Sequence, residues 1–335
     1  MNLLKKIFKW TGIIIGSALI LLIILGLSLR LFSSKPIPSG ELIDVGGFKL
    51  HVKAVGKRNH KPTLVIESGA GAPGEYYYWL GELLKDSIRV IQYDRAGIGY
   101  SELSNSPRDP ETIAYELHTL LEKSGEKPPY ILAGHSYGGH YIRIFKELYP
   151  DEVAGLVFLD SPHPDIDKRL KMPQPPSYVN TLYKAVVVLG DLGLLNLYTQ
   201  MTKRHILWAP GLPDDIMENY RDYTLSGKYV RAYLEEEKGH KKLVELSKRA
   251  SQFDTIPIRV FSGTNLNEPM LRKMGIDPDF IRTERENMQR EMASLSKNGQ
   301  VIFLDGGHIT IFSLKENAEL ICNEILDFIE TLETK

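Results

Sequence analysis

From Glu41 onward, short runs of hydrophobic residues alternate with segments of helical periodicity. The short runs are rich in β-branched residues, which favours strands. The expected strands are Glu41–Val45, Phe48–Ala54, Thr63–Ile66, Arg89–Tyr93, Tyr130–Ala133, Val153–Leu159, Pro257–Phe261 and Val301–Leu304. Helices are expected from Asp109-Pro110 to about Lys123, after Ala133 up to Leu148, and over Leu314–Glu333. Strands that alternate with helices predict an α/β fold with a mostly parallel sheet.

One long stretch departs from this alternation. Between Pro164 and about Asp254 the sequence predicts helices and no strand. The expected helices include the apolar segment Leu182–Tyr198 and the charged segment Arg231–Arg249. We interpret residues 164–254 as a helical cap inserted over the carboxyl edge of the sheet.

The N-terminal segment has a different pattern, because it is apolar on every face. Lys5, Lys6 and Lys9 precede an uncharged run from Thr11 to Leu29, and Arg30 ends it. At about 1.5 Å per residue, such a helix crosses a hydrocarbon core about 30 Å thick. We expect a membrane anchor over residues 1–32, a linker over 33–40 and a globular domain over 41–335. A cleaved signal peptide and a buried helix are the alternatives.

The lysines before this run predict how the chain is oriented. Positively charged residues next to a membrane span favour the cytoplasmic side. The N-terminus is therefore expected in the cytoplasm and the globular domain on the extracytoplasmic side.

Composition excludes several classes of protein. The chain has 335 residues, of which 43% are hydrophobic and 25% charged, as in ordinary globular proteins. The formal net charge of −1 gives no field that would attract nucleic acid, so no nucleic-acid partner is expected. Cys322 is the single cysteine, which excludes an intramolecular disulfide and a cysteine-based zinc site. We expect Cys322 to be a buried residue of the last helix.

The segment Gly134-His135-Ser136-Tyr137-Gly138 matches the pattern G-x-S-x-G. The pattern alone is weak evidence, but it lies between a predicted strand and a predicted helix. A nucleophile elbow requires this position, and small residues two before and two after the serine relieve the crowding of its strained turn. Ser136 is therefore the candidate nucleophile, and a surface serine in a glycine-rich turn is the alternative.

A serine hydroxyl needs a base, and an imidazole needs a partner that orients it. His308 follows the last predicted strand, in Asp305-Gly306-Gly307-His308. Its loop returns to the carboxyl edge of the sheet, where the elbow also lies, so His308 is the candidate base. Two carboxylates are candidates for the acid, because Asp160 and Glu268 each follow a strand.

An acyl-transfer site also needs N–H donors for the oxyanion. One donor is expected to be the backbone of Tyr137, the residue after the nucleophile. The other is expected in the loop after Thr63–Ile66, where Ala70 follows the glycine of the turn. A flexible loop with no such role is the alternative.

Three segments together resemble the α/β-hydrolase superfamily. They are Ser68-Gly69-Ala70-Gly71, the stretch Tyr93-Asp94-Arg95-Ala96-Gly97-Ile98-Gly99-Tyr100-Ser101, and the elbow together with Gly307-His308. The resemblance covers about residues 41–332 and implies an eight-stranded sheet with a helical cap. Many members have histidine where this chain has Ser68, and many have aspartate soon after the glycine that matches Gly263. Since no aspartate follows Gly263 until Asp277, the resemblance favours Asp160 as the acid.

The expected function is hydrolysis of a carboxylic ester through an acyl-serine, with no cofactor and no metal. A lipophilic substrate is expected, bound by aromatic and apolar cap residues; the alternative is that these residues only attach the cap to the core. They include Tyr178, Tyr183, Tyr198, Trp208, Tyr220, Tyr223, Tyr229, Tyr233, Ala185–Leu189 and Leu192–Leu197, with Tyr76-Tyr77-Tyr78-Trp79 beside the oxyanion loop. An aminopeptidase resembling prolyl aminopeptidases and an inactive binding protein of the same fold are the alternative functions. Haloalkane dehalogenases and epoxide hydrolases use aspartate as nucleophile, so Ser136 argues against both.

Overall fold

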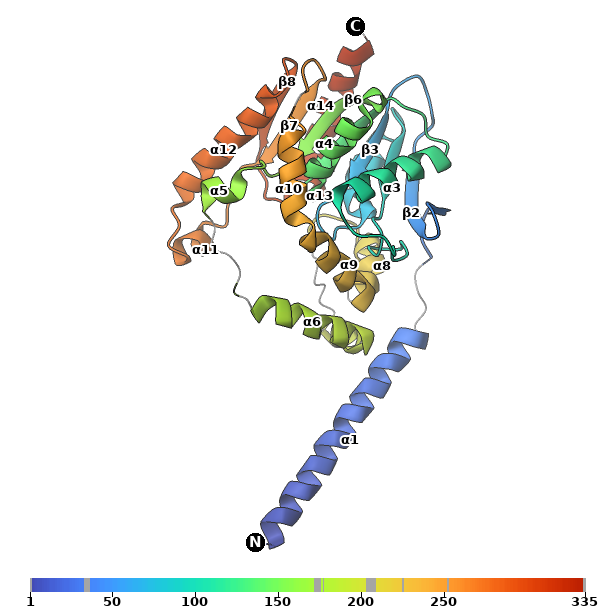
Figure 1. Cartoon of the computed structure of the whole chain (residues 1–335), viewed down its shortest axis with the longest axis vertical. Coiled ribbons are helices and arrows are strands. Elements are labelled where there is room, and N and C mark those ends of the chain that lie inside the picture. Colours follow the sequence, from blue (N-terminus) through green and yellow to red (C-terminus); the bar gives the residue numbers. More distant parts are fainter. Residues whose placement is uncertain are drawn as a thin grey trace.

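The computed structural model describes residues 2–32, 37–171, 176, 178–202, 209–224, 226–251 and 253–333. It contains an eight-stranded sheet in the order β1-β2-β4-β3-β5-β6-β7-β8 (Figure 1). The strands are β1 (Glu41–Asp44), β2 (Lys49–Val55), β3 (Thr63–Glu67), β4 (Val90–Tyr93), β5 (Tyr130–His135), β6 (Val153–Leu159), β7 (Ile258–Gly263) and β8 (Gly299–Leu304). β1 and β2 are antiparallel to their neighbours and the other pairs are parallel, which confirms the predicted fold class.

Most residues of the inner strands are apolar and buried, because helices cover both faces of the sheet. In β3, Leu64 and Ile66 pack on one face with α2 (Tyr78–Leu84) and α14 (Lys315–Glu333). Val65, between them, packs on the other face with α3 (Pro110–Lys123) and α4 (Gly138–Leu148). Alternate residues of a strand thus enter two cores, which is why the pattern reads as a continuous apolar run. Cys322 is buried on α14, as expected.

Local sequence signals set several helix ends. The Asp109 side chain accepts a hydrogen bond of 3.2 Å from the Thr112 amide, and Pro110 occupies the first position of α3. Asp277 and Pro278 repeat this arrangement at α12 (Pro278–Ser294), a helix that our sequence analysis did not assign. The other helices not assigned from the sequence are α2, α11 (Glu268–Lys273), α13 (Thr310–Ser313), and the short η1 (Gly74–Tyr77) and η2 (Pro150–Glu152).

The described residues between β6 and β7 form helices and no strand. They are α5 (Ile166–Leu170), α6 (Tyr178–Asp191), α7 (Leu194–Thr202), α8 (Asp214–Thr224), α9 (Gly227–Lys238) and α10 (His240–Arg249). Two segments expected as single helices are each divided. The first bends by 82° between α6 and α7, where Gly193 has a φ of +69°. The second is interrupted at Gly239, between α9 and α10.

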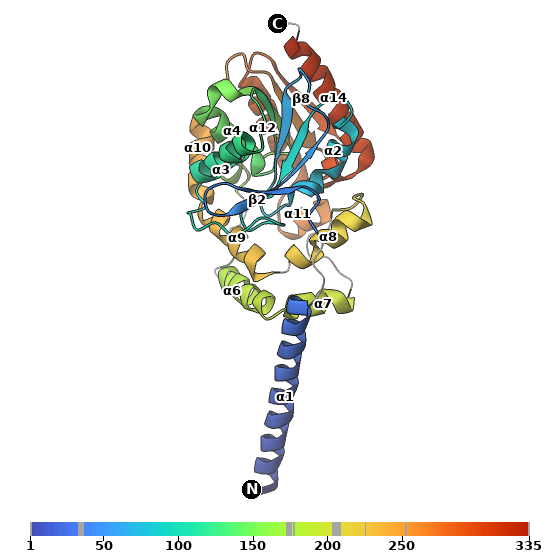
Figure 2. The same cartoon turned by 90° about the vertical axis from the view of Figure 1, so that its right-hand side faces the viewer.

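Helix α1 (Asn2–Phe32) projects away from the sheet, and its far end is the N-terminus (Figure 2). Within Leu3–Phe32, the most apolar window of 18 residues has a mean hydropathy of 2.7 and is only 6% buried. Length and composition therefore allow it to cross a membrane, and a signal sequence has the same properties.

A buried histidine between two helices is expected to make the free energy of unfolding depend on pH. His140 of α4 lies with its Nδ1 2.7 Å from Ser247 Oγ of α10, and burial lowers its pKa to about 3. The folded state keeps this ring neutral, whereas the unfolded chain takes up a proton near pH 6.5. The unfolded state therefore binds more protons, and the free energy of unfolding should fall as the pH drops from about 6.5 to about 3.

We expect His140→Gln to reduce this slope by up to about 1.4 kcal/mol per pH unit. Urea unfolding of the full chain in detergent, repeated from pH 7 to pH 4, measures the slope. The matched control is His60→Gln, because His60 is exposed. An unchanged slope in His140→Gln, or an equal change in both variants, would contradict a neutral buried His140.

Candidate active site

Ser136 occupies a strained turn between β5 and α4. Its φ is +53°, in the left-handed region, and its amide donates to the Leu159 carbonyl of β6 at 3.1 Å. A Cβ added to Gly134 would overlap the backbone of Gly138, and one added to Gly138 would overlap the Glu67 carbonyl oxygen. The two glycines of the motif are therefore required by close backbone approach, which is the geometry of a nucleophile elbow.

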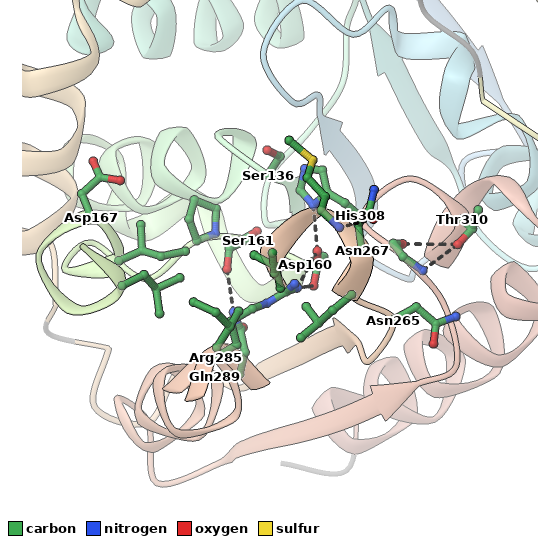
Figure 3. Close-up of a pocket in the computed structure, with 18 of the residues that line it drawn as sticks. Ser136, Asp160, Ser161, Asp167, Asn265, Asn267, Arg285, Gln289, His308 and Thr310 are labelled. Atoms are coloured by element: carbon green, nitrogen blue, oxygen red, sulfur yellow. Dashed lines mark hydrogen bonds and ion pairs between the residues drawn. The ribbon is translucent and has the colours of Figure 1, made fainter. Parts of the chain in front are cut away.

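His308 and Asp160 form a hydrogen-bonded pair next to this turn (Figure 3). The Nδ1 of His308 lies 2.7 Å from Oδ2 of Asp160, and both residues line one cavity with Ser136. An ionised carboxylate only accepts hydrogen bonds, so the proton of a neutral His308 ring is on Nδ1. Its Nε2 is then left with a free lone pair, as a general base requires.

Asp160 is held as a carboxylate by four neighbours, namely Ser262, Gly263, Arg285 and His308. It follows β6 with a φ of +43°, and its Oδ1 accepts from the Gly263 amide at 3.0 Å. Arg285 Nη2, from α12, lies 2.9 Å from Oδ1 and 3.2 Å from Oδ2. Burial opposes ionisation, but the hydrogen bond with His308 and the charge of Arg285 outweigh it and lower the pKa of Asp160. Our sequence analysis missed Arg285; the Asp277-Pro278 helix start is the signal that marks its helix.

Glu268, the other candidate acid, lies elsewhere. It is the first residue of α11, and its carboxylate pairs with Arg282 at 2.6 Å and Arg272 at 3.3 Å. These contacts are on the surface, where ion pairs add little stability. The structure therefore brings Asp160, and not Glu268, to His308.

The loop after β3 is held by Arg95. Its Nη1 donates to the Ser68 carbonyl at 2.6 Å and its Nη2 to the Gly69 carbonyl at 2.8 Å. In a trans peptide the C=O and the following N–H point in opposite directions. The Ala70 amide shares a peptide with the Gly69 carbonyl, so it points away from Arg95. A Cβ added to Gly69 would lie 3.1 Å from Cβ of Ser136, which places this loop against the elbow.

The two amides expected as oxyanion donors are both free to bind a ligand. Across the described ranges, neither the Ala70 nor the Tyr137 amide donates a hydrogen bond to the protein. The neighbouring Gly69 amide, in contrast, donates to the Tyr77 hydroxyl at 3.0 Å. An unpaired amide at a site of negative charge is suited to bind an oxyanion.

A chain of hydrogen bonds connects this loop to the loop of His308. The Tyr77 hydroxyl lies 2.9 Å from Nδ1 of His135, and Nε2 of His135 lies 2.9 Å from the His308 carbonyl oxygen. A carbonyl oxygen only accepts, so Nε2 of His135 has the proton and Nδ1 accepts from Tyr77. Burial, and then the nearby His308, lower the pKa of His135 to about 3, so this ring stays neutral. His135, identified from the sequence only as part of the elbow motif, thus connects both loops.

The cavity in front of Ser136 has a volume of about 890 Å³. Its apolar wall comes from α5, α11, α12 and the loop after β7, and consists of Ile166, Leu170, Leu266, Met270, Leu271, Met274 and Ile281. The expectation that cap aromatics line it is wrong for the described residues, since Tyr220 and Tyr229 are buried in packing. Trp208 lies outside the described residues.

Among the residues that the structure describes, no group of three His, Cys, Asp or Glu side chains is placed to hold a metal ion.

Comparisons with known proteins agree with this fold. A sequence model described as alpha/beta hydrolase fold matches residues 62–214. An uncharacterized protein of Bacillus subtilis is 37% identical over 123 residues, covering 36% of this chain and 37% of that protein. A proline iminopeptidase of Lactobacillus acidophilus is 31% identical over 117 residues, covering 33% and 40%. The matches thus span less than half of each of these relatives.

The solved structures agree over most of the chain. An alpha/beta hydrolase fold protein from Burkholderia ambifaria superposes with a TM-score of 0.61 at 18% identity, covering 87% of this chain and 98% of that one. The chain therefore has the α/β-hydrolase fold, and residues 62–214 match the sequence model of that family.

Proposed function

We propose that the chain hydrolyses carboxylic esters through an acyl intermediate on Ser136. The observation that supports this most is the His308–Asp160 pair, placed with Ser136 on one cavity whose far wall is apolar. A serine with a nearby imidazole and an oriented carboxylate suits acyl transfer. The similarity to α/β hydrolases supports hydrolase activity in general. The apolar cavity is our reason for proposing an ester as the substrate.

In the proposed acylation step, Nε2 of His308 takes the hydroxyl proton as Ser136 Oγ bonds to the ester carbonyl carbon. The electron pair of the C=O bond moves to its oxygen, and the amides of Ala70 and Tyr137 donate to that oxyanion. When the tetrahedral species collapses, the bond to the alkoxide breaks and His308 gives it the proton. Water then attacks the acyl-serine by the same route and releases the acid. Asp160 stabilises the imidazolium throughout.

The aminopeptidase is the second candidate, supported by the local similarity to a proline iminopeptidase. Such an enzyme needs a carboxylate to bind the ammonium group of its substrate. Among the described residues that line the cavity, Asp167 is the one carboxylate besides Asp160, and its side chain is 66% exposed. A solvated carboxylate binds an ammonium weakly, so the cavity favours an ester.

We also propose that α1 anchors the enzyme in a membrane. The apolar length of Leu3–Phe32 supports this, together with Lys5, Lys6 and Lys9 before it and Arg30 near its end. By the charge rule, the N-terminus then lies in the cytoplasm and the hydrolase on the extracytoplasmic side.

Ser136→Ala tests the reaction class. We expect loss of both labelling by a fluorophosphonate probe and hydrolysis of a p-nitrophenyl ester, by at least about a thousandfold, because the nucleophile is removed. Ser294→Ala is the control, since Ser294 is exposed on α12. An inactive binding protein would show neither activity in the unaltered chain, and retained turnover in Ser136→Ala would refute the nucleophile.

Substitutions of the two candidate acids test the assignment of Asp160. We expect Asp160→Asn to lower kcat by about 10⁴-fold, because an amide no longer holds the imidazole tautomer or stabilises its charge. Glu268→Gln is the matched carboxylate-to-amide control, and its kcat should stay within a few-fold of the unaltered chain. A reversed order in steady-state kinetics would assign the acid to α11.

A series of esters with acyl chains from acetyl to decanoyl tests the apolar wall. Each buried methylene should add up to about 0.8 kcal/mol, or about fourfold in kcat/KM, until the cavity is filled. Met270→Gln combined with Met274→Gln should flatten this rise, because both side chains line the wall and are exposed enough to be changed without unfolding. Leu320→Gln on α14 is the control. A falling series, with turnover of prolyl amides, would favour the aminopeptidase.

A further inference from the structure

Helices α6 and α7 expose large apolar side chains that nothing in the described chain covers. These residues, which we name the α6–α7 face, are Tyr178, Leu182, Val188, Leu189, Tyr198 and Met201. Val188 is 55% exposed and Met201 76%. Soluble proteins seldom expose a run of large apolar residues on two successive helices, so such a face indicates a partner.

The bend between α6 and α7 is in contact with α1. A Cβ added to Gly26 would lie 2.6 Å from the Leu192 carbonyl oxygen, and one added to Gly193 would overlap the Gly26 carbonyl. Backbone touches backbone here because both residues are glycine. The contact is reinforced by ion pairs, since Asp191 lies 3.7 Å from Arg30 and 2.7 Å from Arg231 of α9.

This contact sets the level of the α6–α7 face relative to α1. Lys9 and Arg30 are the charges on either side of the uncharged run. Gly26 lies about 25 Å along the helix from Lys9, at about 1.5 Å per residue. Since a hydrocarbon core is about 30 Å thick, Gly26 lies near its far boundary. Figures 1 and 2 show α6 and α7 lying across this end of α1.

We propose that the α6–α7 face lies in the headgroup and outer acyl region of the bilayer that α1 crosses, so that the partner of this face is lipid. This rests on the proposed membrane anchor. Helices that lie flat at a membrane surface have one apolar face and are bounded by charged groups, and Arg30, Asp191 and Arg231 provide that polar boundary. The bent pair α6–α7 is also apolar enough, by composition, to enter a membrane.

The position of the α6–α7 face in the bilayer bears on which substrate reaches Ser136. Helices α5 and α11, which wall the cavity of Ser136, lie on the side of the sheet that faces α6 and α1 (Figure 1). A lipophilic ester dissolved in the bilayer would then be on the same side of the hydrolase as helices that wall the cavity. The substrate class that this geometry favours is a membrane-borne acyl ester.

Fluorescent labels at single introduced cysteines test, in the full chain, whether the α6–α7 face contacts lipid. Three variants, Val188→Cys, Leu19→Cys and Leu320→Cys, are labelled with bimane and reconstituted in phosphatidylcholine nanodiscs that hold one chain each. Leu19 reports on α1, and Leu320 is an exposed apolar residue of α14, a helix that Figure 2 shows away from α1. The native Cys322 does not interfere, because it is buried and burial raises the pKa of its thiol to about 12. Quenching by doxyl-labelled lipid is compared with quenching by aqueous iodide.

We expect doxyl lipid to quench the labels at Val188 and Leu19, and iodide to quench the label at Leu320. Quenching by doxyl lipid at Leu19 but not at Val188 would support the anchor and would overturn the proposed contact between the α6–α7 face and lipid. A label at Val188 that is protected from both quenchers would show that protein covers the face, which also overturns it. No quenching at Leu19 would refute the anchor and this inference together.

Because the labels report lipid contact and not turnover, the result is independent of the proposed chemistry.

A kinetic comparison then tests the substrate class. Leu182→Glu combined with Val188→Glu should lower hydrolysis of a long-chain ester embedded in the nanodisc several-fold more than hydrolysis of a soluble short-chain ester. An equal effect on both substrates would contradict a membrane-borne ester, while loss of activity only in Ser136→Ala would still support the proposed reaction.

Discussion

The buried guanidinium of Arg95 is the interaction on which the arrangement of the site depends. It pairs with Glu67 at the end of β3 at 2.6 Å and with Glu236 of α9 at 2.9 Å, and it donates to the two carbonyls of the oxyanion loop. Removing Arg95 would leave two buried carboxylates without their cation, which is strongly destabilising. One cation therefore fixes the peptide of Ala70, the end of a central strand and the position of the inserted helices, so the oxyanion site depends on how the insertion packs.

A second constraint connects the acid to the cavity wall. Asp160 shares its carboxylate between His308 and Arg285, and Arg285 is on the same helix as Ile281, which lines the cavity. The positive charge of Arg285 keeps Asp160 ionised. It also offsets part of the negative charge that Asp160 presents to the His308 imidazole. The positive φ of Asp160 gives its side chain this position, and the amide of Gly263 supports it. The geometry of the acid thus depends on α12 as much as on β6.

The sequence predicted those parts of the molecule that local patterns determine. The strands, the Asp109-Pro110 helix start and the positions of Ser136 and His308 at one sheet edge follow from periodicity, turn residues and strand order. The bend at Gly193 was missed, because a single glycine in an apolar helix is also tolerated without a break. The pairs Arg95–Glu236 and Arg285–Asp160 join residues 141 and 125 positions apart. No local pattern encodes such pairings, and they decide how the site is held.

The apolar residues around the site have three different uses, which explains why composition alone misassigned them. Aromatic residues of the insertion are used in packing, as Tyr220 shows by its burial and its hydrogen bond to Glu75 at 2.9 Å. Apolar residues of α6 and α7 remain exposed beside α1. The cavity wall consists of apolar side chains that are not aromatic, including Met270 and Met274. The flexible thioether chains of methionine adapt to ligands of different shapes. In the proposed reaction such a wall selects substrates by length and apolar area, since it offers few polar groups that would distinguish one acyl chain from another.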